Sequence, residues 1–224
     1  MKITYSIQVC NESRELFSLL SFLKQSIDWE GGDEIDVIVD KDNKTDKIDM
    51  VLGYFKDDIN VHEREFDNFC NIGNYHTKVA KGDWIFYIDA DEMPQFHLID
   101  DIKRVINDSQ ADIIYVPRIN IHPGSTKQFL KDMKFQENQV GFINWPDMQG
   151  RLYRRCDEIT WTGELHTKLT GPDTLRTVAL QPNPSFALWH IKSMEKQNSR
   201  WKKNEDGTYD IASPTSGNLY DVLM

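Results

Sequence analysis

A chain of 224 residues is long enough to bury a substantial core, and its 39% hydrophobic and 28% charged residues exclude a largely disordered protein. Its formal net charge of -10 argues against a nucleic-acid backbone as partner, because phosphate contacts need a concentrated basic surface. We therefore expect a single domain spanning residues 1–224, which would meet an anionic ligand only with a cation or with local Lys and Arg side chains.

The cysteines and the apolar segments bear on location. Cys10, Cys70 and Cys156 are odd in number and widely spaced, so neither a disulfide framework nor a thiolate zinc site is indicated. The first residues lack the apolar stretch of a signal peptide, and no segment has the apolar length of a membrane span. These features predict a cytoplasmic protein without an integral membrane segment, and they leave its oligomeric state unknown.

The first half of the chain alternates strand and helix patterns. Residues 3–9 are β-rich, and residues 13–27 carry leucines at helical spacing. Residues 34–40 are typical of a buried strand that ends in an acid. A short apolar run at 50–55 follows, and residues 64–80 show mixed helical periodicity. The chain is thus predicted to begin with a β-α-β unit.

The middle of the chain continues this alternation. Residues 84–91 form an apolar run that leads directly into carboxylates, as expected for a strand buried on both faces of a parallel sheet. A helix is predicted from Pro94 through Ile106, and a further strand at 111–121. The sheet should therefore be covered by helices on both faces.

The second half has a different character. Strand-like pieces at 141–145, 150–155 and 187–191 are separated by Pro and Gly, without a clear long helix between them. A final helix is predicted over 193–205, followed by a C-terminal tail at 206–224 that runs along the surface or frays.

Asp89 and Asp91 end the apolar run of 84–91. Alternation along a strand would place both on one side, at the carboxyl end where open α/β sheets bind ligands. Like charges a few Å apart repel, and a divalent cation that prefers oxygen ligands would neutralise them. D-x-D also arises by chance among 36 acidic residues, but its place after a strongly apolar strand favours a Mn²⁺ or Mg²⁺ site.

Further motifs surround this carboxylate pair in a characteristic order. They are Asn11-Glu12 after the first strand, residues 40–46 after the second, Asn74 with residues 80–84 before the D-x-D, residues 150–166 (GRLYRRCDEITWTGELH), and residues 189–192 (WHIK). Together they resemble the pattern of glycosyltransferase family 2, and the resemblance covers residues 3 to 205. It implies an α/β GT-A fold, which is a Rossmann-like three-layer α/β/α arrangement with a central mostly parallel sheet. Residues 1–92 would form the nucleotide-sugar-binding half and residues 93–205 the acceptor-binding half.

The resemblance also implies a function. Such an enzyme moves a sugar from a nucleotide-diphosphate sugar to an acceptor saccharide or other hydroxyl, with inversion and with a Mn²⁺ or Mg²⁺ ion. The family pattern places the metal on Asp91, with Asp89 and His190 as further ligands. It assigns nucleotide-sugar contacts to Asn11, Glu12, Asp40, Asp42, Asn74, Asp89, Ala90, Arg151 and Lys192.

Inverting transfer needs a carboxylate that accepts the proton of the acceptor hydroxyl. Glu164 is the first candidate and Asp147 the second. The family usually has Glu after the His of its late motif, whereas this chain has His166-Thr167, so the base remains open. Three tryptophans are candidates either for an acceptor platform or for core packing: Trp145, Trp161 and Trp189.

Three alternatives remain open. A catalytically weak or inactive GT-A module would bind sugar or nucleotide without turnover. In a D-x-D phosphatase the first Asp is a nucleophile, but that motif normally opens the domain, whereas here two β-α elements precede residue 89. A nucleotidyltransferase would need a Gly-rich phosphate loop after the first strand, and the NESREL segment at 11–16 contains no glycine.

Overall fold

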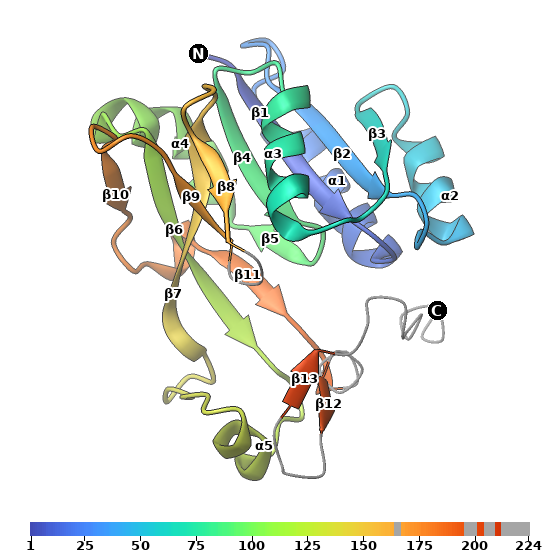
Figure 1. The fold of residues 1–224 in the computed structure, drawn as a ribbon, viewed down its shortest axis with the longest axis vertical. Helices are drawn as coiled ribbons and strands as arrows, with labels where there is room; N and C mark the ends of the chain where they lie inside the picture. The colour runs from blue at the N-terminus through green and yellow to red at the C-terminus, as the bar shows by residue number, and fades with distance from the viewer. Residues whose placement is uncertain (164–166, 195–200, 204–208, 212–224) are drawn as a thin grey trace.

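The computed structural model describes residues 1–163, 167–194, 201–203 and 209–211, and its centre is a nine-stranded sheet (Figure 1). The strands are ordered β3-β2-β1-β4-β7-β6-β11-β5, and β10 pairs with β6. β7 runs antiparallel to β4 and β6, and β5 runs antiparallel to β11, whereas the other pairings are parallel. The strands of this sheet are β1 (Ile3–Val9), β2 (Glu34–Asp40), β3 (Asn60–Arg64), β4 (Trp84–Asp89), β5 (Glu92–Pro94), β6 (Ile113–Ile121), β7 (Ile143–Arg154), β10 (Thr177–Ala179) and β11 (Leu188–Ile191).

Helices cover both faces of the sheet (Figure 1). The helices are α1 (Ser13–Ser26), α2 (Asp46–Tyr54), α3 (Phe69–Val79), α4 (Phe96–Ser109) and α5 (Lys127–Asp132). α1, α2 and α4 lie on one face, and α3 lies on the other with the short strand β8 (Thr160–Thr162) packed against it. β8 pairs with β9 (Lys168–Thr170) in a separate two-stranded sheet. The layers match the predicted α/β/α arrangement.

Alternation along β4 divides the core between the two faces. Phe86 and Ile88 belong to the apolar cluster that includes the leucines of α1, whereas Ile85 and Tyr87 belong to the cluster on the opposite face. Such alternation is the geometric consequence of a strand covered on both sides. It also places Asp89, the last residue of β4, on the same face as Tyr87.

Strands β1 and β2 end where the sequence predicts, and α1 is one residue shorter than its predicted range. The apolar run at 50–55 lies largely within α2, and β3 was not predicted. The pieces at 141–145 and 150–155 fall in one strand, β7. The predicted final helix is wrong at Trp201–Lys203, which forms β12 and pairs with β13 (Tyr209–Ile211); residues 195–200 and 204–205 lie outside the described part.

The topology brings the carboxyl ends of β1, β2, β4, β6 and β11 to one edge of the sheet. Because β7 runs in the opposite direction, its amino-terminal half lies beside the carboxyl end of β6, where Arg118 pairs with Asp147 in the ladder. Residues from the two halves of the chain therefore meet at this edge.

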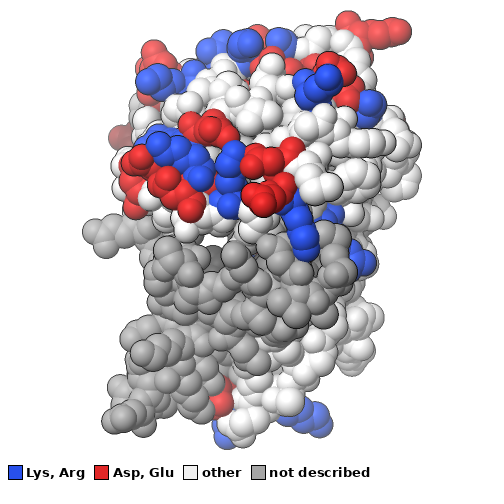
Figure 2. Space-filling model, turned by 90° about the vertical axis from the view of Figure 1, so that its right-hand side faces the viewer, with Lys and Arg blue, Asp and Glu red and all other residues white. Residues whose placement is uncertain are grey.

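The surface carries mixed charge where α2 and β3 face outward. Figure 2 shows Lys and Arg side chains interspersed with Asp and Glu on that side of the molecule. Ion pairs in this region join Lys44 to Asp49 at 2.7 Å and to Glu63 at 2.6 Å. Within the described segments, no helix combines the length and the apolar character needed to cross a membrane.

Candidate active site

Asp89 is held by an arginine from a neighbouring strand. The Nη2 atom of Arg151 lies 2.5 Å from Asp89 Oδ2 and 2.6 Å from Glu92 Oε1, and the guanidinium also lies over the Tyr87 ring at 4.8 Å. Burial by itself would raise the pKa of Asp89, but the charge and hydrogen bond of Arg151 hold it below its usual value. Asp89 is thus an ionised carboxylate with an arginine as its partner.

A second arginine extends this charge network. Arg118 Nη1 donates to Glu92 Oε1 at 2.9 Å, while its Nε and Nη2 donate to Asp147 Oδ2 at 2.9 and 2.7 Å. Asp147 also accepts hydrogen bonds from Asn120 and Gln149. Burial opposes ionisation of Asp147, but these partners lower its pKa overall. The lowered pKa of Asp147 and the contacts of its oxygens argue against a role as the base, and the assignment stays a prediction.

Asp91 lies in the turn after β4 and faces β11. Its Oδ2 is 3.5 Å from His190 Nε2 and 3.5 Å from Lys192 Nζ. His190 and Lys192 are buried, and His190 Nδ1 lies 2.7 Å from Asn120 Oδ1. Burial lowers the pKa of His190 although Asp91 opposes the shift, so the ring is predominantly neutral at neutral pH, the form that binds metals.

The predicted metal ligands are only partly brought together. β4 ends at Asp89, so strand alternation does not extend to Asp91, and the two carboxylates face different partners. In the described ranges, no group of three or more His, Cys, Asp or Glu side chains could hold a metal ion. Asp91 and His190 nevertheless fit part of a metal shell. Asp91 Oδ2 and His190 Nε2 are 3.5 Å apart, a distance that suits two adjacent ligands of one ion, each about 2.0–2.3 Å from it. Mg²⁺ usually takes its other ligands from phosphate and water.

Four predicted nucleotide-binding residues, Asn11, Glu12, Asp40 and Asp42, lie at the carboxyl ends of β1 and β2. Glu12 Oε2 accepts hydrogen bonds from the backbone N–H groups of Cys10 and Asn11 at 3.0 and 3.1 Å, which closes the β1–α1 turn. Asp40 is buried, and its Oδ1 accepts the backbone N–H of Asp42 at 3.2 Å. The backbone N–H of Ala90 donates to the Gln8 carbonyl at 3.0 Å. These acids shape the loops at the edge of the sheet.

Asn74 lies on α3 and has a structural partner. Its Nδ2 donates to the Trp161 carbonyl at 3.0 Å, and its Oδ1 accepts the Trp161 N–H at 2.8 Å. Trp161 is buried against Tyr87 and Tyr153, which favours core packing over an acceptor platform. The nucleotide-binding role of Asn74 remains a prediction.

The other tryptophans lie near the second half of the site. Trp145 and Trp189 both pack on Phe142, with ring centroids 5.7 and 6.0 Å apart. The indole Nε1 of Trp189 is buried without a hydrogen-bond partner in the structure as described. Glu164, the first candidate for the base, lies outside the described residues, as does His166.

Sequence reasoning missed Arg118 and Asn120. Both lie on β6, two residues apart, where polar side chains interrupt the predicted strand 111–121 close to its carboxyl end. Their position is the signal that would have found them, since ligand sites form at such strand ends.

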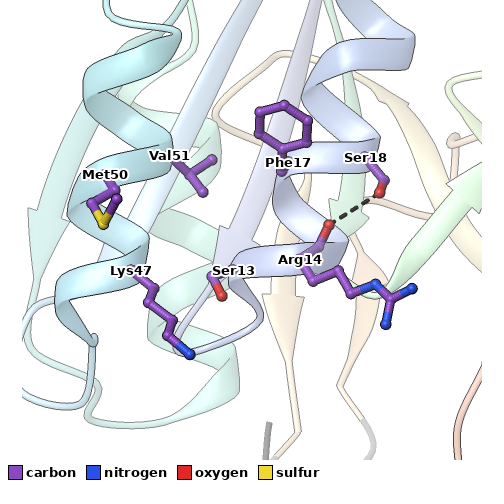
Figure 3. Close-up of a pocket in the computed structure, with 7 residues that line it drawn as sticks. All are labelled: Ser13, Arg14, Phe17, Ser18, Lys47, Met50 and Val51. Carbon is purple, nitrogen blue, oxygen red and sulfur yellow. Dashed lines mark hydrogen bonds between the residues drawn. The ribbon is translucent and has the colours of Figure 1, made fainter. Parts of the chain in front are cut away.

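A pocket of about 460 Å³ lies elsewhere, between α1 and α2 (Figure 3). It is largely apolar, with Arg14 and Lys47 at its rim, and its lining residues are Ser13, Arg14, Phe17, Ser18, Lys47, Met50 and Val51. It includes none of the predicted site residues, so we treat it as separate from the carboxylate cluster.

Solved structures with a similar fold include one that is described as a mannosyltransferase and one that holds UDP-GlcNAc. S. aureus TarS 1-349 in complex with UDP-GlcNAc matches with a TM-score of 0.58 and 14% identity, covering 86% of this chain and 59% of that one. The mannosyltransferase PcManGT from Pyrobaculum calidifontis in complex with GDP-Man and Mn2+ matches with a TM-score of 0.54 and 13% identity, covering 84% of this chain and 56% of that one. This chain therefore spans less than two thirds of the length of either.

At such low identity the likeness establishes the GT-A fold and nothing finer. No curated protein matches the sequence significantly. The family comparison is more informative, because the pattern described as Glycosyl transferase family 2 matches residues 7–194, which is most of the chain. The chain belongs to glycosyltransferase family 2.

Proposed function

We propose that this chain is a metal-dependent glycosyltransferase that moves a sugar from a nucleotide-diphosphate sugar to an acceptor saccharide or other hydroxyl, with inversion. The observation that carries the proposal is the pairing of Asp91 with His190 at the carboxyl edge of the sheet. Family membership supports the reaction class. UDP-GlcNAc and GDP-Man, bound by the two similar structures, are donors to test first.

The charge balance of the cluster supports a requirement for a cation. Arg118, Arg151 and Lys192 lie among four carboxylates, those of Asp89, Asp91, Glu92 and Asp147. With His190 neutral, this cluster carries excess negative charge and would repel a diphosphate. A divalent cation would neutralise the diphosphate as it leaves.

Each protein group has a distinct proposed task. Asp91 and His190 hold Mn²⁺ or Mg²⁺, and Lys192 places its ammonium close to the same carboxylate. Arg151 fixes the orientation of Asp89 beside the donor. Asn11, Glu12, Asp40 and Asp42 line the loops where the nucleotide would bind.

The base remains the least supported assignment. Glu164 is the proposed acceptor of the proton from the attacking hydroxyl, because Asp147 has a lowered pKa and is bound by Arg118. Replacement of Glu164 by Gln should then reduce transfer while leaving donor binding unchanged, a separation that single-turnover and binding measurements would reveal.

The test of the function measures donor turnover. The purified chain is incubated with UDP-GlcNAc or GDP-Man and Mn²⁺, and release of the nucleoside diphosphate is followed with and without saccharide acceptors. Asp91→Asn should lower turnover by at least about 100-fold, because the interaction with a catalytic metal contributes several kcal/mol.

The matched control is Asp57→Asn, which removes the same charge from an exposed turn after α2 and should leave turnover unchanged. Full turnover by Asp91→Asn, or equal turnover with excess EDTA, would refute metal-dependent transfer. Binding of the donor without any turnover would instead support a binding-only module.

A further inference from the structure

A continuous line of polar contacts lies behind His190. Asn120 Nδ2 donates to Asp147 Oδ2 at 2.8 Å, and Asn120 Oδ1 lies 2.7 Å from His190 Nδ1. On its other side, His190 Nε2 lies 3.5 Å from Asp91 Oδ2. The line thus runs from Asp147 through Asn120 and His190 to Asp91.

The chemistry of these groups fixes the direction of every hydrogen bond. An ionised carboxylate only accepts, so the amide nitrogen of Asn120 must be the atom that faces Asp147. The amide oxygen then faces His190, and because this oxygen also only accepts, Nδ1 must carry the hydrogen. Nε2 is then the nitrogen that presents its lone pair to a cation beside Asp91 once it carries no hydrogen.

We propose that Asn120 and Asp147 are positioning residues that hold His190 as the Nδ1–H tautomer, so that Nε2 is presented to a divalent cation beside Asp91. The inference rests on the proposed metal-dependent function and deepens it. It gives Asp147 a task other than that of the base, since its carboxylate orients the Asn120 amide.

The opposite tautomer conflicts with the same contacts. A hydrogen on Nε2 would leave Nδ1 as an acceptor, and the Asn120 amide would have to turn over to donate to it. Its oxygen would then face the Asp147 carboxylate at 2.8 Å, placing two acceptors in contact. Two acceptors in contact are unfavourable where Asn120 is buried and Asp147 is half-buried, so the contact to Asp147 disfavours this arrangement.

The residues of this line lie on neighbouring strands of the sheet, where the pairing of the strands holds them together. Asn120 and His190 are direct partners in the parallel β6–β11 ladder, and Arg118 is the partner of Asp147 in the β6–β7 ladder. Arg118 also binds the Asp147 carboxylate through two nitrogens, which fixes its orientation. Metal-bound histidines commonly depend on such partners for their tautomer and ring orientation.

The test reads the tautomer directly by ¹⁵N NMR of histidine-labelled protein without metal. His190→Gln identifies the His190 signals among the six histidines. At a pH where the ring is neutral, we expect the wild-type Nδ1 to show the shift of a protonated ring nitrogen and Nε2 that of an unprotonated one. Asn120→Ala should give a mixture of tautomers and weaken Mn²⁺ binding by about 10–100-fold in calorimetry.

Two further variants separate positioning from general stability. Asp147→Asn should act like Asn120→Ala, because an amide opposite Asn120 no longer excludes the turned-over orientation. Gln149→Ala is the matched control, since it removes a hydrogen bond of 2.6 Å to Asp147 but leaves the Asn120 contact in place. It should retain the wild-type tautomer and Mn²⁺ affinity even if its unfolding midpoint falls.

The outcomes distinguish this inference from the proposed function. Failure of the wild-type protein to bind Mn²⁺ in the presence of nucleotide would overturn the metal-dependent function. Mn²⁺ binding together with an Nε2–H tautomer in the metal-free protein would overturn the positioning role alone. The same conclusion would follow if Asn120→Ala kept both the tautomer and the affinity of the wild type.

Discussion

Arg151 places one guanidinium nitrogen between the carboxylates of Asp89 and Glu92 in the interior of the site. Removing this cation would leave Asp89 without its arginine partner and Glu92 with Arg118 alone, and breaking a buried pair typically costs about 3–5 kcal/mol. Arg151→Met should therefore lower the free energy of unfolding by about 3 kcal/mol, measured by urea denaturation at pH 7.

Arg154→Met is the control on the same strand. Arg154 is exposed and pairs with Asp112 at 2.8 Å, and surface pairs of this kind contribute about 0–1 kcal/mol. Similar losses of unfolding free energy in the two variants would mean that the Arg151 contacts stabilise the protein no more than an exposed ion pair does.

His76 makes stability depend on pH. It is fully buried on α3, with Ser6 Oγ 2.6 Å from Nδ1 and Gln8 Oε1 3.1 Å from Nε2, and burial lowers its pKa to about 3. The folded value lies below the unfolded value of about 6.5, so the unfolded state takes up the proton first. The contribution of neutral His76 is complete above pH 6.5 and is lost as the pH falls toward 3.

We expect His76→Gln to flatten the pH dependence of stability. The free energy of unfolding of the wild type should fall between pH 6.5 and 5 more steeply than that of the variant, by about 1 kcal/mol per pH unit. Urea denaturation across this range would measure both slopes. Parallel slopes would show that His76 is not held in its neutral form.

Among the elements, α2 and α3 each contain a glycine with a different surrounding. A Cβ added to Gly73 on α3 would lie 2.5 Å from the Trp161 ring, whereas one added to Gly53 on α2 would meet no atom within 4 Å. The first glycine permits β8 to pack closely on its helix, and the second has no such role. The same substitution should therefore have opposite effects in the two helices.

Gly73→Ala should lower the free energy of unfolding by about 1–3 kcal/mol, because overpacking exceeds the gain in helix propensity. Gly53→Ala should raise it by about 0.5–1 kcal/mol through the helix propensity of alanine. Thermal or urea unfolding of both variants provides the comparison. Stabilisation of both would show that Trp161 moves away without cost.

Element prediction succeeded where the signal was local. Residues 3–9 and 34–40 formed the expected strands because each is a short segment rich in β-branched and aromatic or aliphatic residues. β3 was not predicted because it lies at the edge of the sheet, where its exposed and partly exposed residues alternate without an apolar run. Trp201–Lys203 pair with Tyr209–Ile211 in place of the predicted helix, since strand pairing depends on a partner that periodicity does not register.

For the whole molecule, binding of nucleotide and metal should be coupled to stability. Ligands that bind the native state alone raise its stability by about 2.7 kcal/mol at a concentration of 100 times their Kd. We expect UDP or GDP to raise the unfolding temperature strongly with Mn²⁺ and weakly without it, because a protein of net charge -10 repels a free diphosphate.

EDTA should reverse this shift, and Asp91→Asn should abolish it. Differential scanning fluorimetry with each nucleotide, with and without Mn²⁺, would also identify the preferred base. An equal shift in EDTA would contradict cation-mediated binding.

Two predictions about the whole chain are not tested by the structure. They are the boundary at residues 92 and 93 between a donor-binding half and an acceptor-binding half, and the cytoplasmic location.

The sequence by itself determined the family, the α/β class and the edge of the sheet where we propose the active site. The class and the edge follow from local information, namely apolar runs, their spacing and the acids at their ends, and the family follows from the resemblance of the motifs. The apolar run marked Asp89 and Asp91 as candidates, although it placed them on one side by extending β4 two residues too far, and the family resemblance marked His190.

Only the tertiary structure decided which side chains meet. Arg151 reaches Asp89 across 62 positions of sequence, and Asn120 reaches His190 across 70. Those partnerships depend on the order and register of β4, β7, β6 and β11. Register is set by the packing of the whole sheet and cannot be predicted from any single segment. The pairing of Arg151 with Asp89 and of Asn120 with His190 is therefore known only from the folded chain.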